Sequence, residues 1–307
     1  MSKVLIATEK PFAAPAVAGI KQILTEAGFE VATLEKYTSK SELLAAVADA
    51  EAIIIRSDII DAEVFDAAKQ LKIVVRAGAG YDNVDLEAAT AHGVCVMNTP
   101  GQNANAVAEL VFAMLLFAVR NRFNGTSGTE LKDKKLGLLA YGNTGRNVAR
   151  IAKGIGMEIY AYDPFTPAEA IEKEGVHAVA SQKELFSTCD IVSLHIPATP
   201  ETKGSIGREL VSLLPKKAIL VNTARKEIIN EPELIALLKE REDLRYLADI
   251  RPAAHEEFEA AAGERYFSTP KKMGAQTAEA NTNAGLAAAH QIVGFIKEGN
   301  ERFRLNK

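Results

Sequence analysis

The sequence has little of what marks secreted, membrane-spanning or nucleic-acid-binding proteins. Only two cysteines occur in its 307 residues, Cys95 and Cys189, and both lie in or beside apolar runs without CxxC spacing. That usage predicts buried free thiols in a reducing compartment rather than disulfides. The most apolar run, Leu110–Val119, is too short to cross a bilayer. The chain starts directly with a strand-like segment, so we expect no signal peptide and a cytoplasmic protein.

The sequence also lacks an excess of either charge. Its formal net charge of -4 argues against a general nucleic-acid-binding surface, and we expect neither nucleic acid nor membrane as a partner. We find no repeat of fixed period and no low-complexity segment. A length of 307 residues suits about two domains with a sizeable core.

Strand-like runs alternate with helix-like runs along nearly the whole chain. Such alternation predicts an α/β fold with parallel sheets and crossover helices. A helix at about Gln102–Arg122 separates two series of strands, and another, at about Glu279–Lys297, comes near the end. The two series suggest two α/β domains, with the nucleotide fold in the second. The expected strands are VLIAT, FEVATL, AIIIRS, KIVVRAG and VCVMN, then LGLLAY, EIYAY, DIVSLHI, AILVN and RYLADI.

The segment Leu136–Asp163 carries the strongest functional signal. It reads as a strand, a tight turn with Gly142 and Gly145, an amphipathic helix and a second strand that ends at Asp163. This order is typical of a dinucleotide-binding βαβ unit. Gly142 lets the backbone approach a pyrophosphate, Gly145 allows close helix–strand packing, and the helix N-terminus offers N–H groups to the phosphates.

Asp163 predicts the choice of cofactor. It lies about 20 residues past the glycines, where a carboxylate accepts hydrogen bonds from the adenosine ribose. Pro164 follows rather than an arginine, so a 2′-phosphate would meet a bare carboxylate, and NAD is favoured over NADP. The first glycine of G-x-G-x-x-G is replaced by Ala140. An ordinary turn in a nucleotide-free sheet is the alternative, but the complete strand–turn–helix–strand context favours NAD binding.

Five segments, in order, resemble the D-isomer-specific 2-hydroxyacid dehydrogenases over essentially the whole chain. They are VRAGAGYDNVD (75–85), NTPGQNANAVAEL (98–110), the βαβ unit, DIVSLHIPATPETKG (190–204) and VNTARKEIINEPELIALL (221–238). The resemblance implies two Rossmann-like, doubly wound parallel-sheet domains, with the nucleotide domain inserted into the substrate domain. It assigns 1–98 and 276–307 to substrate binding and 99–275 to NAD binding, with the reaction in the cleft between them. It also implies a homodimer formed through the nucleotide domain.

The resemblance gives Arg225 the role of binding the substrate carboxylate and polarising the C2 oxygen. A guanidinium suits that role because it donates two parallel hydrogen bonds and stays charged. A surface arginine after a strand is the alternative, but ligands of α/β proteins bind at this end of a strand. His195 could act as a base, yet its segment lines the NAD site in the family, and we expect a cofactor contact. The expected cofactor-binding residues are Gly142, Asn143, Thr144, Gly145, Asp163, His195, Pro197, Thr202, Thr223, Ala224, Asp249, Gly274 and Ala275.

Two positions depart from the family pattern together. Most members have a glutamate where this chain has Ala254, and a histidine where counting back from Gly274 places Lys272. A histidine needs a carboxylate to fix its tautomer, whereas a lysine carries its proton without one. We therefore predict Lys272 as the general acid/base, its pKa lowered by desolvation, by Arg225 and by the positive nicotinamide. The alternatives are a solvated lysine pair in an inactive enzyme, or a register with Lys271 at this position.

This lysine arrangement resembles a subgroup of short 3-phosphoglycerate dehydrogenases without a serine-sensing C-terminal domain, and we expect none here. The resemblance implies NAD-dependent oxidation of 3-phosphoglycerate to 3-phosphohydroxypyruvate, the first step of phosphorylated serine biosynthesis, without a metal. Such a substrate carries about three negative charges and needs a cationic pocket. The alternatives are a dehydrogenase for another D-2-hydroxy acid, such as glyoxylate or lactate, or a non-catalytic NAD-sensing protein. The expected substrate-binding residues are Arg56, Ser57, Arg76, Ala77, Gly78, Ala79 and Gly80.

Overall fold

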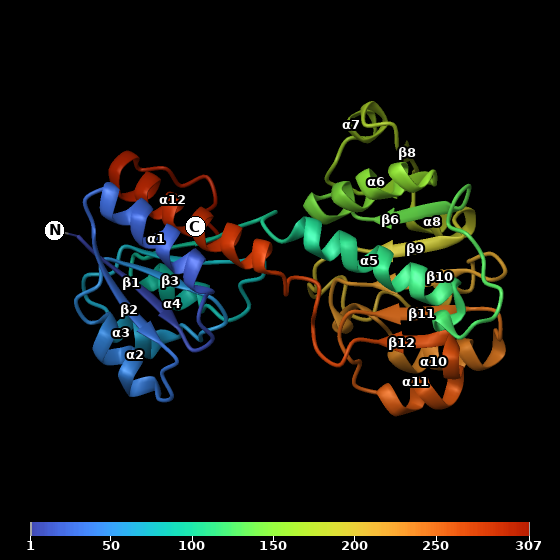
Figure 1. Cartoon of the computed structure of the whole chain (residues 1–307), viewed down its shortest axis with the longest axis horizontal. Helices are drawn as coiled ribbons and strands as arrows, with labels where there is room; N and C mark the ends of the chain where they lie inside the picture. The colour runs from blue at the N-terminus through green and yellow to red at the C-terminus, as the bar shows by residue number, and fades with distance from the viewer. Residues whose placement is uncertain (1, 307) are drawn as a thin grey trace. The chain divides into compact units, whose positions relative to one another are not determined.

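The computed structural model describes residues 2–306, which form two compact units, each built on a parallel β-sheet (Figure 1). The smaller unit runs to Asn103 and resumes at Thr277, and the larger unit is Ala104–Gln276. The sequence placed these boundaries at 98/99 and 275/276. The α/β fold class with two doubly wound parallel sheets is confirmed, while the role given to each unit stays a prediction.

The smaller unit has a sheet of five strands in the order β2-β1-β3-β4-β5. Helix α12, late in the sequence, packs beside α1 and contacts β3 and β4, which returns the end of the chain to this unit (Figure 1). The strands are β1 (Lys3–Thr8), β2 (Glu30–Glu35), β3 (Ala52–Ile55), β4 (Ile73–Arg76) and β5 (Cys95–Asn98), and the helices are α1 (Ala14–Glu26), α2 (Lys40–Val47), α3 (Ala62–Ala67), α4 (Leu86–Ala91) and α12 (Ala278–Glu298).

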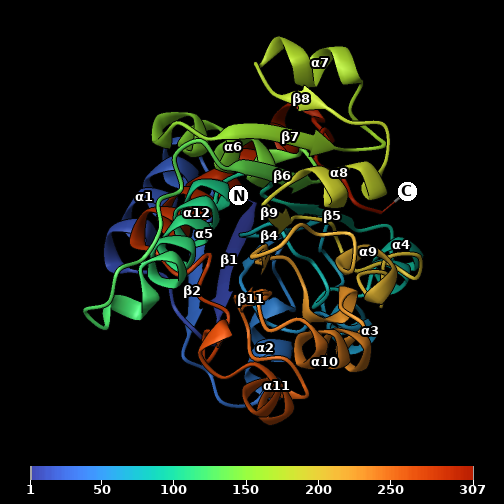
Figure 2. The same cartoon turned by 90° about the vertical axis from the view of Figure 1, so that its right-hand side faces the viewer.

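The larger unit has a sheet of seven strands in the order β12-β11-β10-β9-β6-β7-β8. Figure 2 shows α7 and β8 beyond β7 at one edge of this sheet and α11 near the opposite edge. The strands are β6 (Lys135–Leu139), β7 (Glu158–Tyr162), β8 (His177–Ala178), β9 (Ile191–Leu194), β10 (Ile219–Asn222), β11 (Arg245–Ala248) and β12 (Tyr266–Ser268), and the helices are α5 (Ala104–Val119), α6 (Asn143–Ile155), α7 (Ala168–Lys173), α8 (Gln182–Thr188), α9 (Arg208–Val211), α10 (Glu231–Glu240) and α11 (His255–Ala262).

Helices cover both faces of the larger sheet, as the alternating side chains of β6 show. Leu136 and Leu138 belong to a buried cluster with residues of α5 and α6, whereas Leu139 belongs to a second cluster with residues of α8 to α11. Parallel strands buried on both faces read as continuous apolar runs, which is how these strands appear in the sequence. Within residues 2–306, no helix is both long and apolar enough to span a membrane.

The ten strands expected from the sequence are all present, and the structure adds two. β8 has two residues and β12 has three. Both lie at the edges of the larger sheet and are too short to give a pattern of their own. Most predicted functional residues follow the longer, apolar strands, whereas Lys272 and Gly274 follow β12.

Candidate active site

The carboxyl ends of four neighbouring strands bring most predicted residues of the larger unit to one edge of its sheet. Leu139 of β6 pairs with Leu194 of β9, Leu194 pairs with Asn222 of β10, and Asn222 pairs with Ala248 of β11. The strand order reverses at β6, which has β9 on one side and β7 on the other. In doubly wound sheets, such a switch point at the carboxyl edge is where ligands bind.

The turn after β6 fits a pyrophosphate. Helix α6 starts at Asn143 with Gly142 as N-cap and no side-chain cap, so its first N–H groups are not covered by a capping side chain. A Cβ built on Gly142 would meet no atom within 4 Å, which leaves room for a ligand. A Cβ on Gly145 would lie 2.4 Å from the carbonyl oxygen of Ala140, so that position requires glycine.

The structure also accounts for the departure from the glycine motif at Ala140. Ala140 has φ of 82°, a value that favours glycine, so alanine is accommodated with backbone strain. The turn therefore keeps a backbone conformation that favours glycine, although the residue there is alanine. Asn143 and Thr144 follow in the first turn of α6, the former exposed and the latter half-buried.

Asp163 lies directly after β7, and its carboxylate already binds backbone. Oδ2 accepts from the Tyr141 N–H at 2.8 Å and Oδ1 accepts from the Phe165 N–H at 2.8 Å. The first bond connects the carboxylate to the turn that carries Gly142. Because each carboxylate oxygen has two lone pairs, both oxygens can still accept from a ribose hydroxyl.

The turn after β10 brings Arg225 and Lys272 together, although they are far apart in sequence. Arg225 Nη1 donates to the Ala224 carbonyl at 3.0 Å, and Lys272 Nζ donates to the same oxygen at 3.1 Å. Lys272 is half-buried and Lys271 is exposed. Of the two lysines in the KKMG segment, Lys272 is therefore the one whose ammonium lies beside Arg225.

Asp249, which follows β11, holds the segment that carries Lys272. Its Oδ1 accepts from Thr269 Oγ1 at 2.9 Å and from the Met273 N–H at 2.7 Å, and its Oδ2 accepts from the Gly274 N–H at 2.8 Å. The carboxylate is 1% exposed. Most of its accepting capacity is used inside the protein, so Asp249 positions the lysine segment whether or not it also contacts a nicotinamide.

Buried polar atoms without a protein partner lie at the same edge. His195 Nε2 and Thr223 Oγ1 are buried and have no hydrogen-bond partner within the described part of the chain. Burial lowers the pKa of His195 to about 4, so its ring is neutral near pH 7 and a weak base. Such orphaned atoms fit a site whose remaining hydrogen bonds come from a ligand.

The other predicted cofactor residues lie in the connections that follow these strands. Pro197 is exposed in the loop after β9, where its carbonyl accepts from Thr202 Oγ1 at 2.6 Å. Thr202 Oγ1 also accepts from the Thr199 N–H at 2.7 Å, so this side chain closes the loop. Ala275 is half-buried next to Gly274.

The position of the missing family glutamate has a carboxylate nearby from another element. Ala254 is the N-cap residue of α11, and its N–H donates to Glu231 Oε2 at 2.7 Å. Ala253 donates to Glu231 Oε1 at 3.1 Å. Both oxygens of Glu231 therefore bind the backbone of the loop before α11, so this carboxylate serves to hold that loop.

In the smaller unit, Arg56 follows β3 and uses much of its guanidinium within the unit. Nη1 donates to the carbonyls of Lys10 and Pro11 at 2.9 Å each, and Nη2 donates to Asn281 Oδ1 at 2.6 Å. The guanidinium also lies 5.2 Å from the centroid of the Phe12 ring. Arg56 thus connects the loop after β1 to α12. Ser57, the next residue, is exposed.

Arg76 ends β4 beside β3, since Ile55 pairs with Arg76 in the sheet. Its Nη1 donates to the Ala77 carbonyl at 3.3 Å, and the guanidinium occupies the space beside Gly78. A Cβ on Gly78 would lie 1.3 Å from Arg76 Nη1, and Gly78 has φ of 149°. Only glycine leaves this space to the arginine. The sheet register therefore brings Arg56 and Arg76 to neighbouring strand ends.

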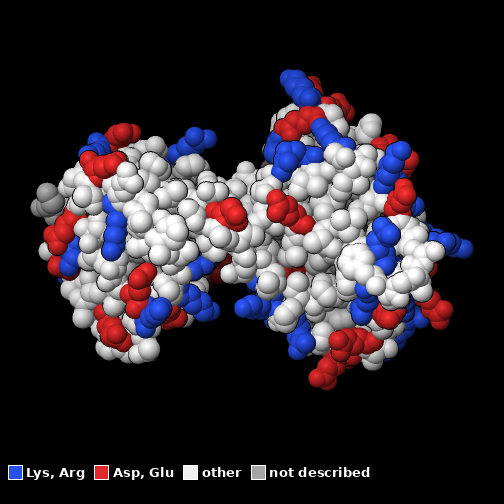
Figure 3. All heavy atoms as spheres, viewed as in Figure 1, with Lys and Arg blue, Asp and Glu red and all other residues white. Residues whose placement is uncertain are grey.

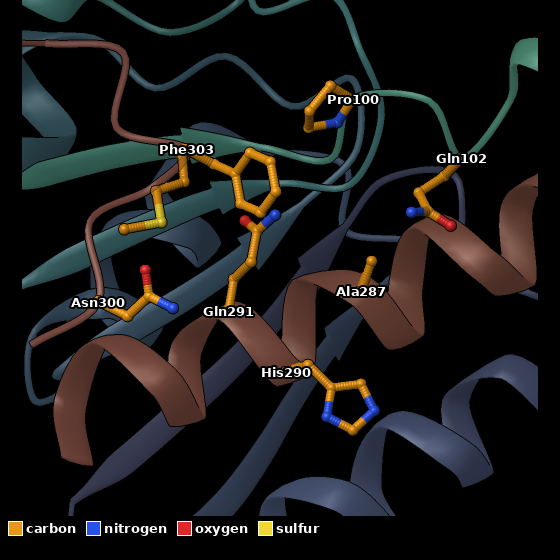
Figure 4. Close-up of a pocket in the computed structure, with 8 residues that line it drawn as sticks. Pro100, Gln102, Ala287, His290, Gln291, Asn300 and Phe303 are labelled. Carbon is orange, nitrogen blue, oxygen red and sulfur yellow. The ribbon is translucent and has the colours of Figure 1, made fainter. Parts of the chain in front are cut away.

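A pocket of about 340 Å³ also lies in the smaller unit, between β5 with the segment after it, α12 and the segment that follows α12 (Figure 4). None of the predicted site residues lines it. It is connected to the loop after β4 through Asn98. Gln291 Nε2 donates to the Asn98 carbonyl at 2.9 Å, and Asn98 Nδ2 donates to the Ala79 carbonyl at 2.6 Å. The lining residues are Met97, Pro100, Gln102, Ala287, His290, Gln291, Asn300 and Phe303.

The sequence analysis missed two residues that shape the site, Asn98 and Asn222. Each is the last residue of a strand, and each side chain binds the backbone of a loop with predicted functional residues. The available signal was an asparagine at the end of a buried apolar run, where Asn commonly binds nearby backbone.

Comparisons with known proteins agree with this geometry. The model of the D-isomer specific 2-hydroxyacid dehydrogenase, NAD binding domain, matches residues 114–270. D-3-phosphoglycerate dehydrogenase of Methanocaldococcus jannaschii is 38% identical over 294 residues, which cover 88% of this chain and 54% of that protein. This chain thus spans about half the length of that relative.

Solved structures match over nearly the full length. The NAD+-bound 3-phosphoglycerate dehydrogenase of Entamoeba histolytica has 48% identity and a TM-score of 0.88, covering 100% of this chain and 99% of its own. D-lactate dehydrogenase of Escherichia coli has 25% identity and a TM-score of 0.77, covering 98% of this chain and 99% of its own.

Proposed function

The chain belongs to the D-isomer-specific 2-hydroxyacid dehydrogenases, and we propose that it oxidises 3-phosphoglycerate at C2 with NAD. The product is 3-phosphohydroxypyruvate, and the reaction is the first step of phosphorylated serine biosynthesis. The observation that carries this proposal is the convergence of Arg225 and Lys272 on one carbonyl oxygen. Two cations side by side at the carboxyl edge of the larger sheet support a role for one in binding a carboxylate and for the other in carrying a proton.

We propose separate roles for the two cations. Arg225 binds the C1 carboxylate and polarises the C2 oxygen, because a guanidinium presents several N–H donors in a planar fork. Lys272, in its amine form, takes the proton of the C2 hydroxyl while the C2 hydride leaves. NAD, when bound, accepts that hydride. In the reverse direction Lys272, as ammonium, returns the proton to the C2 oxygen.

We propose that the turn after β6 and the ends of β9 to β11 hold the NAD. Gly142 and the uncapped start of α6 would bind the pyrophosphate, and Asp163 the adenosine ribose. His195 and Thr223, each with an orphaned polar atom, would supply hydrogen bonds at the neighbouring strand ends.

We further propose that the smaller unit supplies the phosphate-binding cations, Arg56 and Arg76. A phosphate monoester near pH 7 carries between one and two negative charges, and an arginine pair is well suited to bind it. The names of the relatives support this choice of substrate, since the proteins of M. jannaschii and E. histolytica are both 3-phosphoglycerate dehydrogenases.

The decisive experiment measures NADH formation from NAD with 3-phosphoglycerate, D-lactate and D-glycerate in parallel at alkaline pH. The expected result is a kcat/KM for 3-phosphoglycerate well above the other two, and a rate that rises with pH as Lys272 loses its proton. A preference for an unphosphorylated acid would overturn the substrate but keep the family chemistry. No turnover with any of them, together with tight NADH binding, would identify a binding protein instead.

We also propose a homodimer formed through the larger unit. Leu116 of α5 is 44% exposed and Phe123, just after it, is 68% exposed, while the surface over α5 in Figure 3 has few charged side chains. An uncharged surface of this kind fits a second copy of the chain. Light scattering should give the mass of a dimer, and Leu116→Glu should give a monomer. Phe165→Asp, at a 94% exposed position after β7, is the matched control that should stay dimeric.

The buried thiols support a cytoplasmic location. Cys95 and Cys189 are free, and burial raises their pKa to about 11 and about 12, so neither is reactive.

A further inference from the structure

Asn222, the last residue of β10, makes two side-chain hydrogen bonds to the turn that follows it. Its Oδ1 accepts from the Ala224 N–H at 3.0 Å, and its Nδ2 donates to the Arg225 carbonyl at 2.9 Å. The residue is 1% exposed, so solvent cannot take over either bond. The two bonds fix the peptide groups before and after the Ala224–Arg225 peptide and so restrict where the carbonyl of that peptide, the Ala224 carbonyl, points.

That carbonyl is the acceptor shared by Arg225 and Lys272. Arg225 Nη1 lies 3.0 Å and Lys272 Nζ 3.1 Å from this oxygen, and an acceptor shared by two like charges lowers the cost of keeping them close. If the carbonyl rotated away, each cation would lose the common contact. The orientation of this peptide group therefore contributes to the spacing of the two cations.

The lysine side of this arrangement is also tied to Asn222. The Asp249 N–H donates to the Asn222 carbonyl at 2.8 Å, which joins the ends of β10 and β11. The Asp249 carboxylate then holds the N–H groups of Met273 and Gly274, directly after Lys272. Asn222 therefore lies at the centre of a network that reaches both cations through backbone.

We propose that Asn222 is a positioning residue that sets the spacing of Arg225 and Lys272 by orienting the Ala224 carbonyl. This inference rests on the proposed roles of those two cations. Asn222 touches neither substrate nor cofactor in this proposal. Its effect passes through the peptide groups of the turn, so its loss displaces both cations, whereas NADH keeps its proposed contacts outside Thr223 and Ala224.

The test compares two substitutions with a matched control. Asn222→Ala removes both hydrogen bonds, and Asn222→Ser restores an acceptor for the Ala224 N–H through its hydroxyl. Asn230→Ala is the control, because Asn230 caps α10 in the same unit and its loss destabilises a helix without touching the turn. Thermal unfolding of all three variants measures the stability cost.

The first measurement is steady-state kinetics with NADH affinity determined by calorimetry. Asn222→Ala should raise KM for 3-phosphoglycerate about tenfold and lower kcat about 10- to 100-fold, with NADH affinity changed less than about threefold. Asn222→Ser should show a smaller increase in KM and a smaller decrease in kcat than Asn222→Ala. Asn230→Ala should leave KM and kcat near those of the unchanged enzyme at a similar loss of stability.

The second measurement does not depend on turnover. Acetic anhydride labels lysine amines, and mass spectrometry gives the labelling rate of Lys272 against pH, with exposed Lys271 as internal reference. Asn222→Ala should shift the pH dependence of Lys272 labelling relative to Lys271, and Asn230→Ala should not.

The two measurements separate the failure of this inference from the failure of the proposed function. Unchanged KM, kcat and Lys272 labelling in both Asn222 variants would overturn the positioning role. The positioning role would also be overturned if Asn230→Ala, at an equal loss of stability, changed KM, kcat and Lys272 labelling as much as Asn222→Ala does. If the unchanged protein does not oxidise 3-phosphoglycerate but Asn222→Ala still shifts Lys272 labelling, the proposed reaction fails and the positioning role stands.

Discussion

In the larger unit, buried Asn and Asp side chains bind the backbone of the segments that carry the predicted functional cations. In the smaller unit, the predicted functional cation Arg56 binds the backbone of its own unit directly. Asn222 and Asp249 fix the segments that carry Arg225 and Lys272. Arg56, by contrast, donates three hydrogen bonds to its own unit, to Lys10, Pro11 and Asn281. For the two predicted functional cations of the larger unit, other side chains therefore fix the backbone, whereas Arg56 is predicted to bind substrate and also fixes the backbone itself. Substitution of Arg225 or Lys272 should therefore lower activity without lowering the melting temperature, whereas substitution of Arg56 should change both.

The largest expected effect tests the larger unit. Lys272→Ala should lower kcat by the roughly 10²–10⁴-fold typical of a lost acid/base group, while NADH affinity and melting temperature stay near their original values. Steady-state kinetics, calorimetry and thermal unfolding together check this. Lys271→Ala is the matched control and should be nearly silent, because Lys271 is exposed. Lys272→His should recover little, since Ala254 offers no carboxylate to orient an imidazole. Near-normal turnover of Lys272→Ala would refute the acid/base role of Lys272 in the larger unit.

The next effect tests the smaller unit at its two arginines. Arg76→Ala should raise KM for 3-phosphoglycerate about 10- to 100-fold, because a hydrogen bond to a charged group contributes about 1.5–3 kcal/mol. Arg56→Ala should raise that KM and also lower the melting temperature, since it removes three internal hydrogen bonds. KM for NAD serves as the control and should change little in both variants. Wild-type KM for the phosphorylated acid in both would refute the phosphate-binding assignment.

Gly78 offers a second way to test Arg76 without removing its charge. A Cβ at this position would overlap Arg76 Nη1, so Gly78→Ala should displace the guanidinium and reproduce the KM increase of Arg76→Ala. The double variant should have a KM for 3-phosphoglycerate no higher than that of either single variant, because both substitutions act on the same contact. Additive losses would show that Gly78 matters for another reason, such as its positive φ.

Asp163 sharpens the comparison because one carboxylate in the larger unit both holds backbone and is predicted to recognise the cofactor. NAD should be preferred over NADP by at least about tenfold in kcat/KM, which requires only about 1.4 kcal/mol from a phosphate facing a carboxylate. Initial rates with both cofactors measure this ratio. Equal rates with NADP would remove the recognition role and leave only the bonds to the Tyr141 and Phe165 N–H groups.

The smallest effect concerns stability alone. Ala140→Gly should stabilise the protein by up to about 1 kcal/mol, because Ala140 has φ of 82° and glycine adopts that conformation without strain. Urea unfolding measures the change. Ala170→Gly, inside α7, is the matched control and should destabilise by about 0.5–1 kcal/mol. A loss of stability in Ala140→Gly would mean that the turn carries no relievable strain.

The sequence predicted the strands and the dinucleotide turn because both depend on local pattern. Apolar runs between helical periods gave the parallel strands, and the glycines before an amphipathic helix gave the turn at Gly142. The convergence of Arg225 and Lys272 could not be predicted this way, since it depends on the direction of one carbonyl and on two segments far apart in the chain. The internal bonds of Arg56 depend equally on how α12 returns to the smaller unit. Residue propensities and motif spacing along the chain do not predict such long-range contacts.

The bond between Glu231 and the backbone of Ala254 restricts the evolutionary routes open to this chain. Restoring the histidine–glutamate pair common in the family would need Lys272→His and Ala254→Glu together. The N–H of residue 254 is already bound to the Glu231 carboxylate, at 2.7 Å. A glutamate introduced there would place a second negative charge beside the first, and one of the two would have to move or take up a proton. Return to the common pair therefore brings two carboxylates to the start of α11, and its cost depends on how Glu231 adjusts.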